Sequence, residues 1–217
     1  MATAKTPKRA YNNDYPSVTT ILGVLRKIGL EFWFKYNTAK FCDEKSEKGK
    51  LIGTQIHEAI EAYVLKQEVK VDTEHVEEVS NALKGFMLFR KEHPEFILEW
   101  SEEMLTSIKC GYNGTMDCRA TKDGKTIVMD WKTGEAKKKD TPAIYDEYKY
   151  QVAAYVKTYN EVPGEDVGLA MIVSFAKDKV AYSMYTMERS EIDDCFNRAF
   201  LPCLSIYNYQ KLQKESA

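Results

Sequence analysis

Residues 114–134, GTMDCRATKDGKTIVMDWKTG, decide the fold that we expect for this chain. Asp123-Gly124 stands between two runs of β-forming residues, and such a pair favours a two-residue hairpin turn because both turn positions need a positive φ. With these two residues in the turn, Asp117 lies opposite Asp130. The stretch therefore predicts a β-hairpin that places two carboxylates next to each other.

The two faces of this hairpin differ in polarity, because successive side chains of a strand point to opposite sides. Asp117, Asp130 and Lys132 fall on one face. The other face is apolar and is expected to pack in the core; it carries Met116, Cys118, Ala120, Ile127, Met129 and Trp131. Candidate chemistry therefore belongs to the first face.

Two carboxylates directly opposite on antiparallel strands have Cβ atoms about 4.5–5.5 Å apart and repel each other. A divalent cation such as Mg²⁺, which prefers oxygen ligands, would compensate Asp117 and Asp130. Lys132 lies on the same face and could hold or activate a water beside the ion. The alternative is a solvated outer face with an accidental pair of aspartates, and the hairpin alone does not decide between the two.

The composition limits the class of protein. The chain has 217 residues, of which 44% are hydrophobic and 29% charged, as in an ordinary globular domain. No window approaches the roughly 18 consecutive apolar residues of a membrane helix, and no apolar signal segment opens the chain. We expect an intracellular (cytoplasmic) protein, with residues 1–16 as a flexible arm and residues 17–217 as a single domain.

The charge balance argues against a global field that attracts nucleic acid, because 31 basic and 33 acidic residues leave a net charge of −2. A nucleic-acid partner would have to meet a local patch. One candidate is the run Lys137, Lys138 and Lys139, although such a run is more often a solvated loop. Five scattered cysteines without a Cys-x-x-Cys pair argue against a disulfide framework or a zinc module.

A predicted helix over residues 53–66, GTQIHEAIEAYVLK, carries apolar residues at helical spacing. His57 lies at the margin of this stripe, and Glu61 follows one turn later. A lone histidine in that position is more often structural than a ligand. A neutral imidazole near two carboxylates would, however, complete a metal site.

A second predicted helix begins at Thr141-Pro142 and runs to about residue 160. Gln151 and Tyr155 lie one turn apart on it and could together donate hydrogen bonds to a phosphate or to a metal-bound water. In isolation, the same pair would be interpreted as the polar fringe of a core helix.

The remaining pattern predicts further elements. We expect a short helix capped at residue 17 or 19, a helix over 76–91, a strand over 96–109, two strands within 168–187 and a last helix from 190 that bends near Pro202. The charged residues 43–50 are expected to form an exposed connection. The aromatic run around Trp33 is expected to pack on the core.

Four motifs occur in a diagnostic order: the histidine of GTQIHEAIE, the aspartate of GTMD, Asp-Trp-Lys in IVMDWKTG, and Gln-x-x-x-Tyr in QVAAY. This order resembles the PD-(D/E)XK nuclease superfamily, and specifically its RecB-like branch, which includes many phage-type exonucleases. The resemblance covers about residues 53–155. It implies an α/β (α+β) fold, a restriction-endonuclease-like core with a central mixed sheet of about four to five strands flanked by helices.

The resemblance also implies roles for residues of this chain. Lys132 would position and polarise the attacking water, and Gln151 and Tyr155 would lie beside the scissile phosphate. Glu61 is a weaker candidate for support of the site. The implied metal ligands are His57, Asp117, Asp130 and the main-chain carbonyl of Trp131. The implied cofactor is one or two Mg²⁺ or Mn²⁺ ions.

Some members of this branch also hold an iron–sulfur cluster, which needs a group of closely spaced cysteines near the C-terminus. Only Cys195 and Cys203 lie there in this chain, so no iron–sulfur cluster is expected. The chain also lacks a phosphate loop of the G-x-x-x-x-G-K-[ST] form. We therefore expect a stand-alone nuclease or a subunit without its own motor.

The implied activity is metal-dependent hydrolysis of DNA phosphodiester bonds. An exonuclease on single-stranded DNA or duplex ends, acting in recombination, replication or repair, is the first expectation. Its partners would be DNA and a recombination or replication protein, without a membrane. A structure-specific endonuclease of the same fold and a non-catalytic DNA-binding subunit are the alternatives.

Overall fold

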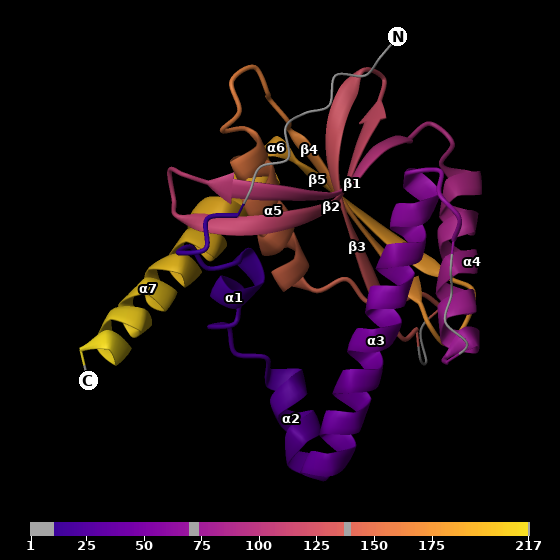
Figure 1. Ribbon diagram of the computed structural model, residues 1–217, viewed down its shortest axis with the longest axis horizontal. Helices are drawn as coiled ribbons and strands as arrows, with labels where there is room; N and C mark the ends of the chain where they lie inside the picture. Colours follow the sequence, from indigo (N-terminus) through magenta and orange to yellow (C-terminus); the bar gives the residue numbers. More distant parts are fainter. Residues whose placement is uncertain (1–10, 70–73, 137–139, 217) are drawn as a thin grey trace.

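A mixed five-stranded sheet lies at the centre of the computed structural model, which describes residues 11–69, 74–136 and 140–216 (Figure 1). The strand order is β1-β2-β3-β4-β5; β3 and β4 are parallel, and the other neighbours are antiparallel. The strands are β1 (Ile97–Ser107), β2 (Tyr112–Lys122), β3 (Lys125–Gly134), β4 (Leu169–Ala176) and β5 (Tyr182–Glu188). This mixed sheet with helices around it confirms the expected fold class.

Helices cover both faces of the sheet (Figure 1). They are α1 (Val18–Leu22), α2 (Ile28–Tyr36), α3 (Ala39–Val64), α4 (Val76–Glu92), α5 (Asp146–Tyr159), α6 (Arg189–Cys195) and α7 (Leu201–Glu215), with a π-helical turn (Phe196–Phe200) between the last two. The π-helical turn ends two residues before Pro202, which has no N–H to donate within a regular helix.

Two hydrophobic clusters hold the layers together, one on each face of the sheet. On one face, α3 and α4 pack against the side chains of Trp131 and Phe175. On the other face, α1, α5, α6 and α7 pack against Val128 and Ile172. Because β3 and β4 are buried on both faces, they form the rigid centre on which polar groups can be positioned.

The turn of the β2–β3 hairpin is as predicted. Asp123 and Gly124 both have positive φ, at 50° and 74°. The ladder runs from the Lys122–Lys125 pair to Cys118–Met129. It ends there, so the expected pairing of Asp117 with Asp130 is wrong.

The cause is a sharp change in β2 at Asp117. Cys118 packs in the cluster of α3 and α4, as expected, whereas Met116 packs in the cluster of α5. Met116 and Cys118 therefore do not share one core face, contrary to simple alternation. The strand twists between them, and the two strands of the hairpin part at the level of Asp117.

Residues 43–50, expected as a connection, belong instead to the 26-residue helix α3. Lysine and glutamate are good helix formers, so a charged run does not interrupt a helix. Thr38 caps the helix by accepting a hydrogen bond from the backbone N–H of Phe41 at 3.3 Å. Lys48 ties it to α4 through an ion pair with Glu78 at 2.6 Å.

The N-terminal segment also differs from expectation. Residues 12–16 are held against β2 by Asn113, whose side chain donates to the carbonyls of Asn12 at 2.7 Å and Tyr15 at 3.0 Å. The backbone N–H of Asn113 donates to Pro16 at 2.8 Å. This part of the expected arm is therefore fixed; residues 1–10 and the lysine run 137–139 lie outside the described residues.

The helix expected from Thr141 begins later, at Asp146. Helix α2 contains the aromatic run around Trp33, and none of its residues is buried, so the expected packing of this run on the core is wrong. Aromatic residues in sequence indicate burial only when another element covers them.

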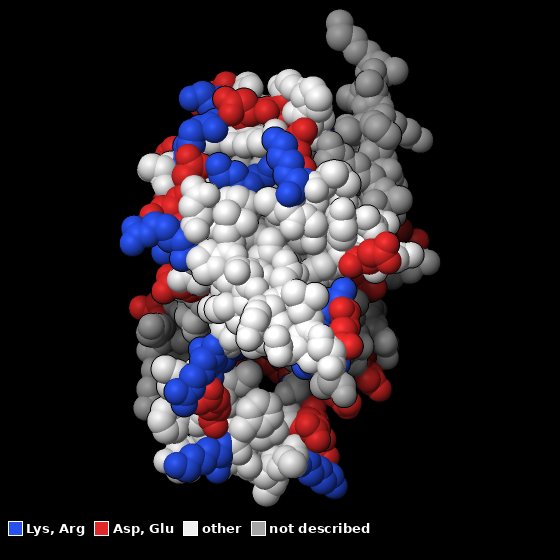
Figure 2. Space-filling view, turned by 90° about the vertical axis from the view of Figure 1, so that its left-hand side faces the viewer, with Lys and Arg blue, Asp and Glu red and all other residues white. Residues whose placement is uncertain are grey.

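Within the described part of the chain, no helix combines the length and the apolar character needed to cross a membrane. Figure 2 shows the side of the molecule on which α7 lies, where a broad area without charged side chains is bordered by charged ones. Helix α7 carries exposed apolar side chains on this side of the fold, namely Ile206, Tyr209 and Leu212.

Candidate active site

The predicted polar residues meet where β2 and β3 part. The Asp117 carboxylate accepts a hydrogen bond through Oδ2 from the backbone N–H of Trp131 at 2.7 Å. This carboxylate thus takes the place of a ladder carbonyl at the point where the β2–β3 pairing has ended. Asp130, the neighbour of Trp131, is fully buried.

Lys132 pairs with Asp130 on the face covered by α5. Its Nζ lies 2.7 Å from Asp130 Oδ2 and 5.1 Å from the centroid of the Tyr148 ring. Burial lowers the pKa of Lys132, but Asp130 and Asp117 outweigh this effect, so that the pKa is raised overall. Lys132 is therefore a cation held inside the fold.

Burial raises the pKa values of both aspartates. The pKa of Asp117 rises to about 6 and that of Asp130 to about 7, although the Lys132 ammonium acts in the opposite direction on both. A carboxylate without enough positive charge nearby takes up a proton more readily. One lysine therefore does not compensate the two carboxylates, and a further cation would.

His57 reaches the same place from α3. Its Nδ1 lies 3.7 Å from Asp117 Oδ1. Burial and the Lys132 ammonium lower the pKa of His57, while the Asp130 carboxylate and a hydrogen bond with the Trp131 backbone act against them. The imidazole is accordingly neutral at pH 7, which is the form that binds a metal.

Glu102 on β1 completes this group and was not predicted from the sequence. Its two neighbours in β1 pair with the two neighbours of Asp117, so Glu102 stands opposite Asp117. Its backbone has a φ of 54°, in the left-handed region that is uncommon for a non-glycine residue. Such an outlier in a strand indicates a functional constraint.

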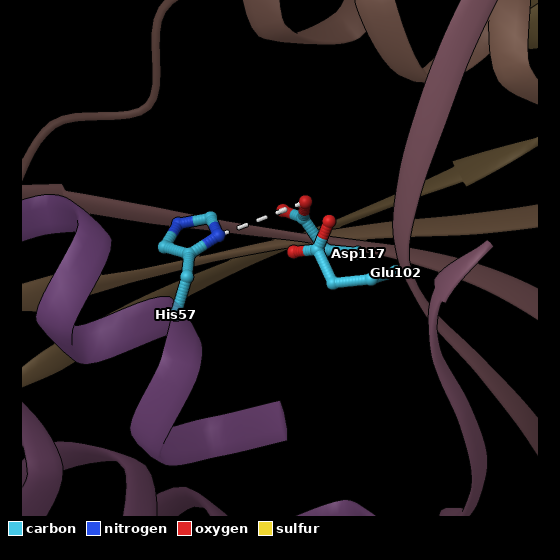
Figure 3. A group of neighbouring side chains, drawn as sticks. All are labelled: His57, Glu102 and Asp117. Atoms are coloured by element: carbon cyan, nitrogen blue, oxygen red, sulfur yellow. Dashed lines mark ion pairs between the residues drawn. The ribbon is translucent and has the colours of Figure 1, made fainter. Parts of the chain in front are cut away.

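Ligand atoms of His57, Glu102 and Asp117 lie within 4.8 Å of one another, and Figure 3 shows the three side chains turned toward a common point. Burial, Glu61 and Asp130 raise the pKa of Glu102. The repelling carboxylates thus face each other across β1 and β2, not across β2 and β3. The acidic residues of the 96–109 strand were the available signal, but using it requires the β1–β2 register.

These donors fit a divalent cation of the Mg²⁺ or Mn²⁺ type. Carboxylate oxygens suit both ions, and an imidazole suits transition metals. A bound cation would offset the buried negative charge that Lys132 leaves uncompensated. We infer that Glu102 joins His57, Asp117 and Asp130 in holding it; the expected ligation by the Trp131 carbonyl stays a prediction.

Gln151 and Tyr155 on α5 lie beside Asp130, as the motif requires. Gln151 Nε2 donates to the Tyr155 hydroxyl at 2.7 Å and approaches Asp130 Oδ1 at 3.4 Å. The Tyr155 ring packs on Gly114, where an added Cβ would lie only 2.6 Å from its Cε1 atom. The glycine of GTMD is therefore needed to seat Tyr155.

A cavity of about 540 Å³ opens beside the group. Its lining consists of Lys50, Gly53, Thr54, His57, Glu58, Glu61 and Glu102. Glu61, expected as a supporting residue, thus lies on the cavity wall next to Glu102. The cavity extends along α3 and reaches His57 and Glu102.

Removal of the Glu102 carboxylate should weaken cation binding. We expect Glu102→Gln to raise the Mn²⁺ dissociation constant at least about tenfold, since even residues that only support metal ligands contribute 10- to 100-fold. Calorimetric titration with Mn²⁺ measures it. Glu188→Gln, at the exposed last position of β5, is the matched control and should bind as the wild type. Equal affinities of Glu102→Gln and the wild type would exclude Glu102 as a ligand.

Cation binding should depend on pH. In the metal-free protein the raised pKa values of Asp117, about 6, and Asp130, about 7, favour the protonated folded state. Their contribution to stability is complete below the unfolded pKa of 3.8 and is lost as pH rises through 6 and 7. Mg²⁺ needs the ionised carboxylates, so it should raise the unfolding temperature more at pH 8 than at pH 5.5. Thermal unfolding in Mg²⁺ and in EDTA at both pH values measures this; an equal rise would contradict it.

No protein-family model matches the chain, and no curated protein matches it. Among solved structures, the crystal structure of SSO0001 is similar with a TM-score of 0.33 and 15% identity; the alignment covers 56% of this chain and 59% of that one, less than two thirds of its length.

Two further similar structures carry descriptive titles. An alkaline exonuclease (LHK-Exo) from Laribacter hongkongensis has a TM-score of 0.39 and 14% identity, with 94% of each chain covered. A phage related exonuclease from Haemophilus somnus 129PT has a TM-score of 0.40 and 12% identity, with 76% of this chain and 83% of that chain covered.

Proposed function

We propose that this chain is a Mg²⁺- or Mn²⁺-dependent deoxyribonuclease, an exonuclease that hydrolyses phosphodiester bonds of single-stranded DNA or of duplex ends. The observation that supports this most is the convergence of Asp117, Asp130 and Lys132 with His57 and Glu102 beside one cavity. A carboxylate-rich group with one fixed internal cation suits a reaction in which negative charge develops on phosphate oxygens.

The chain's own residues would divide the work. Asp117, Asp130, Glu102 and His57 would hold the cation, which when bound would neutralise phosphate charge and lower the pKa of a water. The Lys132 ammonium, 2.7 Å from Asp130, would orient the attacking water and stabilise the developing negative charge.

Helix α5 would position the substrate. The Gln151 amide and the Tyr155 hydroxyl form one hydrogen-bonded unit beside Asp130. Rearranged toward a bound strand, the Gln151 amide can donate to a phosphate oxygen while Tyr155 keeps its place against Gly114.

Cleavage of end-labelled DNA tests the proposal. Linear single strands, linear duplexes and closed circles would be incubated with the protein in Mg²⁺, Mn²⁺ or EDTA, beside the Asp130→Asn variant. We expect metal-dependent release of mononucleotides from the linear substrates alone, and none from the variant.

Other outcomes lead to other functions. Cleavage of closed circles would indicate a structure-specific endonuclease with the same residues. DNA binding without cleavage in any metal would indicate a non-catalytic DNA-binding subunit and would contradict the proposal.

A further inference from the structure

Helix α2 exposes its aromatic side chains. Its sequence is IGLEFWFKY, and none of its residues is buried. The exposed fractions are 53% for Phe32 and 74% for Tyr36, and their two rings are nearly parallel, at 7° with centroids 6.3 Å apart. Exposed aromatic side chains that cluster on one helix are typical of an interaction site.

This helix belongs to an arm, residues 26–50, formed by α2 and the first half of α3. Figure 1 shows the arm projecting below the sheet, at the bottom of the view. Two ion pairs hold its base: Lys27 with Glu147 of α5 at 2.8 Å, and Lys48 with Glu78 of α4 at 2.6 Å. The arm is thus an anchored projection of the fold.

The charge of the arm is opposite to that of the whole chain. Residues 26–50 contain seven basic and four acidic side chains, a net charge of +3, whereas the whole chain has −2. Lysines lie over the aromatic rings: Lys35 Nζ is 5.8 Å from the Tyr36 centroid, and Lys45 Nζ is 5.8 Å from that of Phe41. The lower end of Figure 2, which corresponds to the arm, shows basic and acidic side chains among uncharged ones.

The arm continues into the candidate active site. Helix α3 carries both the end of the arm and His57, and Lys50 of the arm lines the cavity. Phe41 and His57 are sixteen positions apart, which is about 24 Å along a helix. A stacked strand, which rises about 3.4 Å along its axis per nucleotide, would span this distance with roughly seven nucleotides, and an extended strand would span it with fewer.

We propose that the arm binds single-stranded DNA and leads it along α3 to the cavity. Bases would stack on Phe32 and Tyr36 while lysines of the arm neutralise phosphates, the combination by which proteins bind single strands without regard to sequence. A duplex offers no free base faces, so it lacks the stacking contribution. This inference rests on the proposed function, because the bound strand is the substrate of that site.

Binding in EDTA tests the arm without turnover. Fluorescence anisotropy would measure the affinity of a labelled 20-nucleotide oligo(dT) for the wild type and for Phe32→Ala/Tyr36→Ala. We expect at least a tenfold loss of affinity in the double variant, since stacking on even one ring accounts for such a change. Tyr209→Ala, which removes a tyrosine exposed by 65% on α7, is the control and should change affinity less than twofold.

A blunt 20-base-pair duplex of mixed sequence is the second ligand in this binding experiment. Its affinity should change less than twofold in Phe32→Ala/Tyr36→Ala, because its bases are stacked on one another. An equal loss for duplex and single strand would overturn the stacking proposal and leave only electrostatic binding.

Steady-state kinetics in Mn²⁺ then link the arm to the site. The double variant should raise KM at least tenfold for the 20-nucleotide substrate with little change in kcat, and should leave KM for a 2-nucleotide substrate unchanged, because a dinucleotide does not reach α2 from the cavity. Unchanged KM for both substrates would overturn the guiding role.

The two proposals fail in different ways. If the wild type cleaves no DNA but the double variant still loses affinity for single strands, the proposed nuclease activity is contradicted and the proposed role of the arm is supported. If the wild type cleaves DNA but the double variant binds single strands with unchanged affinity, the proposed role of the arm is contradicted and the proposed nuclease activity is supported. A change in sedimentation coefficient instead of in affinity would show that α2 meets a second copy of the chain, which also overturns the inference.

Discussion

Asp130→Asn should lower the rate of phosphodiester hydrolysis at least about a hundredfold, the scale of one lost electrostatic partner in an active site. Asp130 is fully buried, and its Oδ2 holds the Lys132 ammonium at 2.7 Å. An amide of the same shape keeps the packing but has no charge to offer to a cation or to Lys132. The loss should therefore appear in kcat and in metal affinity together.

The initial rate on linear single-stranded DNA in saturating Mn²⁺ measures this effect. Asp123→Asn is the matched control, because it makes the same change at the exposed hairpin turn, where asparagine tolerates the φ of 50°. Circular dichroism and thermal unfolding in EDTA would establish that both variants fold. A folded Asp130→Asn protein with wild-type activity would exclude a metal site at this carboxylate.

Lys132→Ala should also reduce the rate at least about a hundredfold, but through a different step. The ammonium is kept charged inside the fold by Asp130 and Asp117, so it is ready to stabilise charge as it develops on the phosphate. Its removal takes away a competing cation and leaves the carboxylates intact. Metal binding should therefore persist, or strengthen, while catalysis is lost.

This separation distinguishes Lys132 from the metal ligands. Calorimetric titration with Mn²⁺ should show binding by Lys132→Ala and weakened binding by Asp130→Asn. Lys125→Ala, on the exposed end of β3, controls for the loss of a lysine from the same strand. Retained activity in a folded Lys132→Ala protein would remove the lysine from the mechanism.

Local signals predicted the hairpin but not the parting of its strands. The turn at Asp123-Gly124 depends on two residues that need positive φ, and both are visible in sequence. The end of the ladder at Cys118–Met129 depends on how β2 packs against α5, where Tyr155 lies on Gly114. Contacts between such distant segments are not encoded in the alternation of one strand.

The role of Glu102 and the exposure of α2 were not predicted for the same reason: both depend on how distant segments of the chain are arranged. The motif residues were identified because their order along the chain resembles a family, and the structure brings them together. Glu102 belongs to no such motif, and its place opposite Asp117 follows from the β1–β2 register. The aromatic run of α2 has the composition of a core segment, and only the absence of a covering element in the described fold shows that it is exposed.

The hydrogen bond from Trp131 to Asp117 has a consequence for ion selectivity. One carboxylate oxygen of Asp117 is engaged by the sheet at 2.7 Å, and Oδ1 faces His57. Such a carboxylate is predisposed to monodentate coordination, which suits the small, octahedral Mg²⁺, whereas Ca²⁺ accepts bidentate carboxylates and more ligands at longer distances. The hydrogen bond from the Trp131 backbone would thereby favour Mg²⁺ over Ca²⁺, which has the same charge and a larger radius.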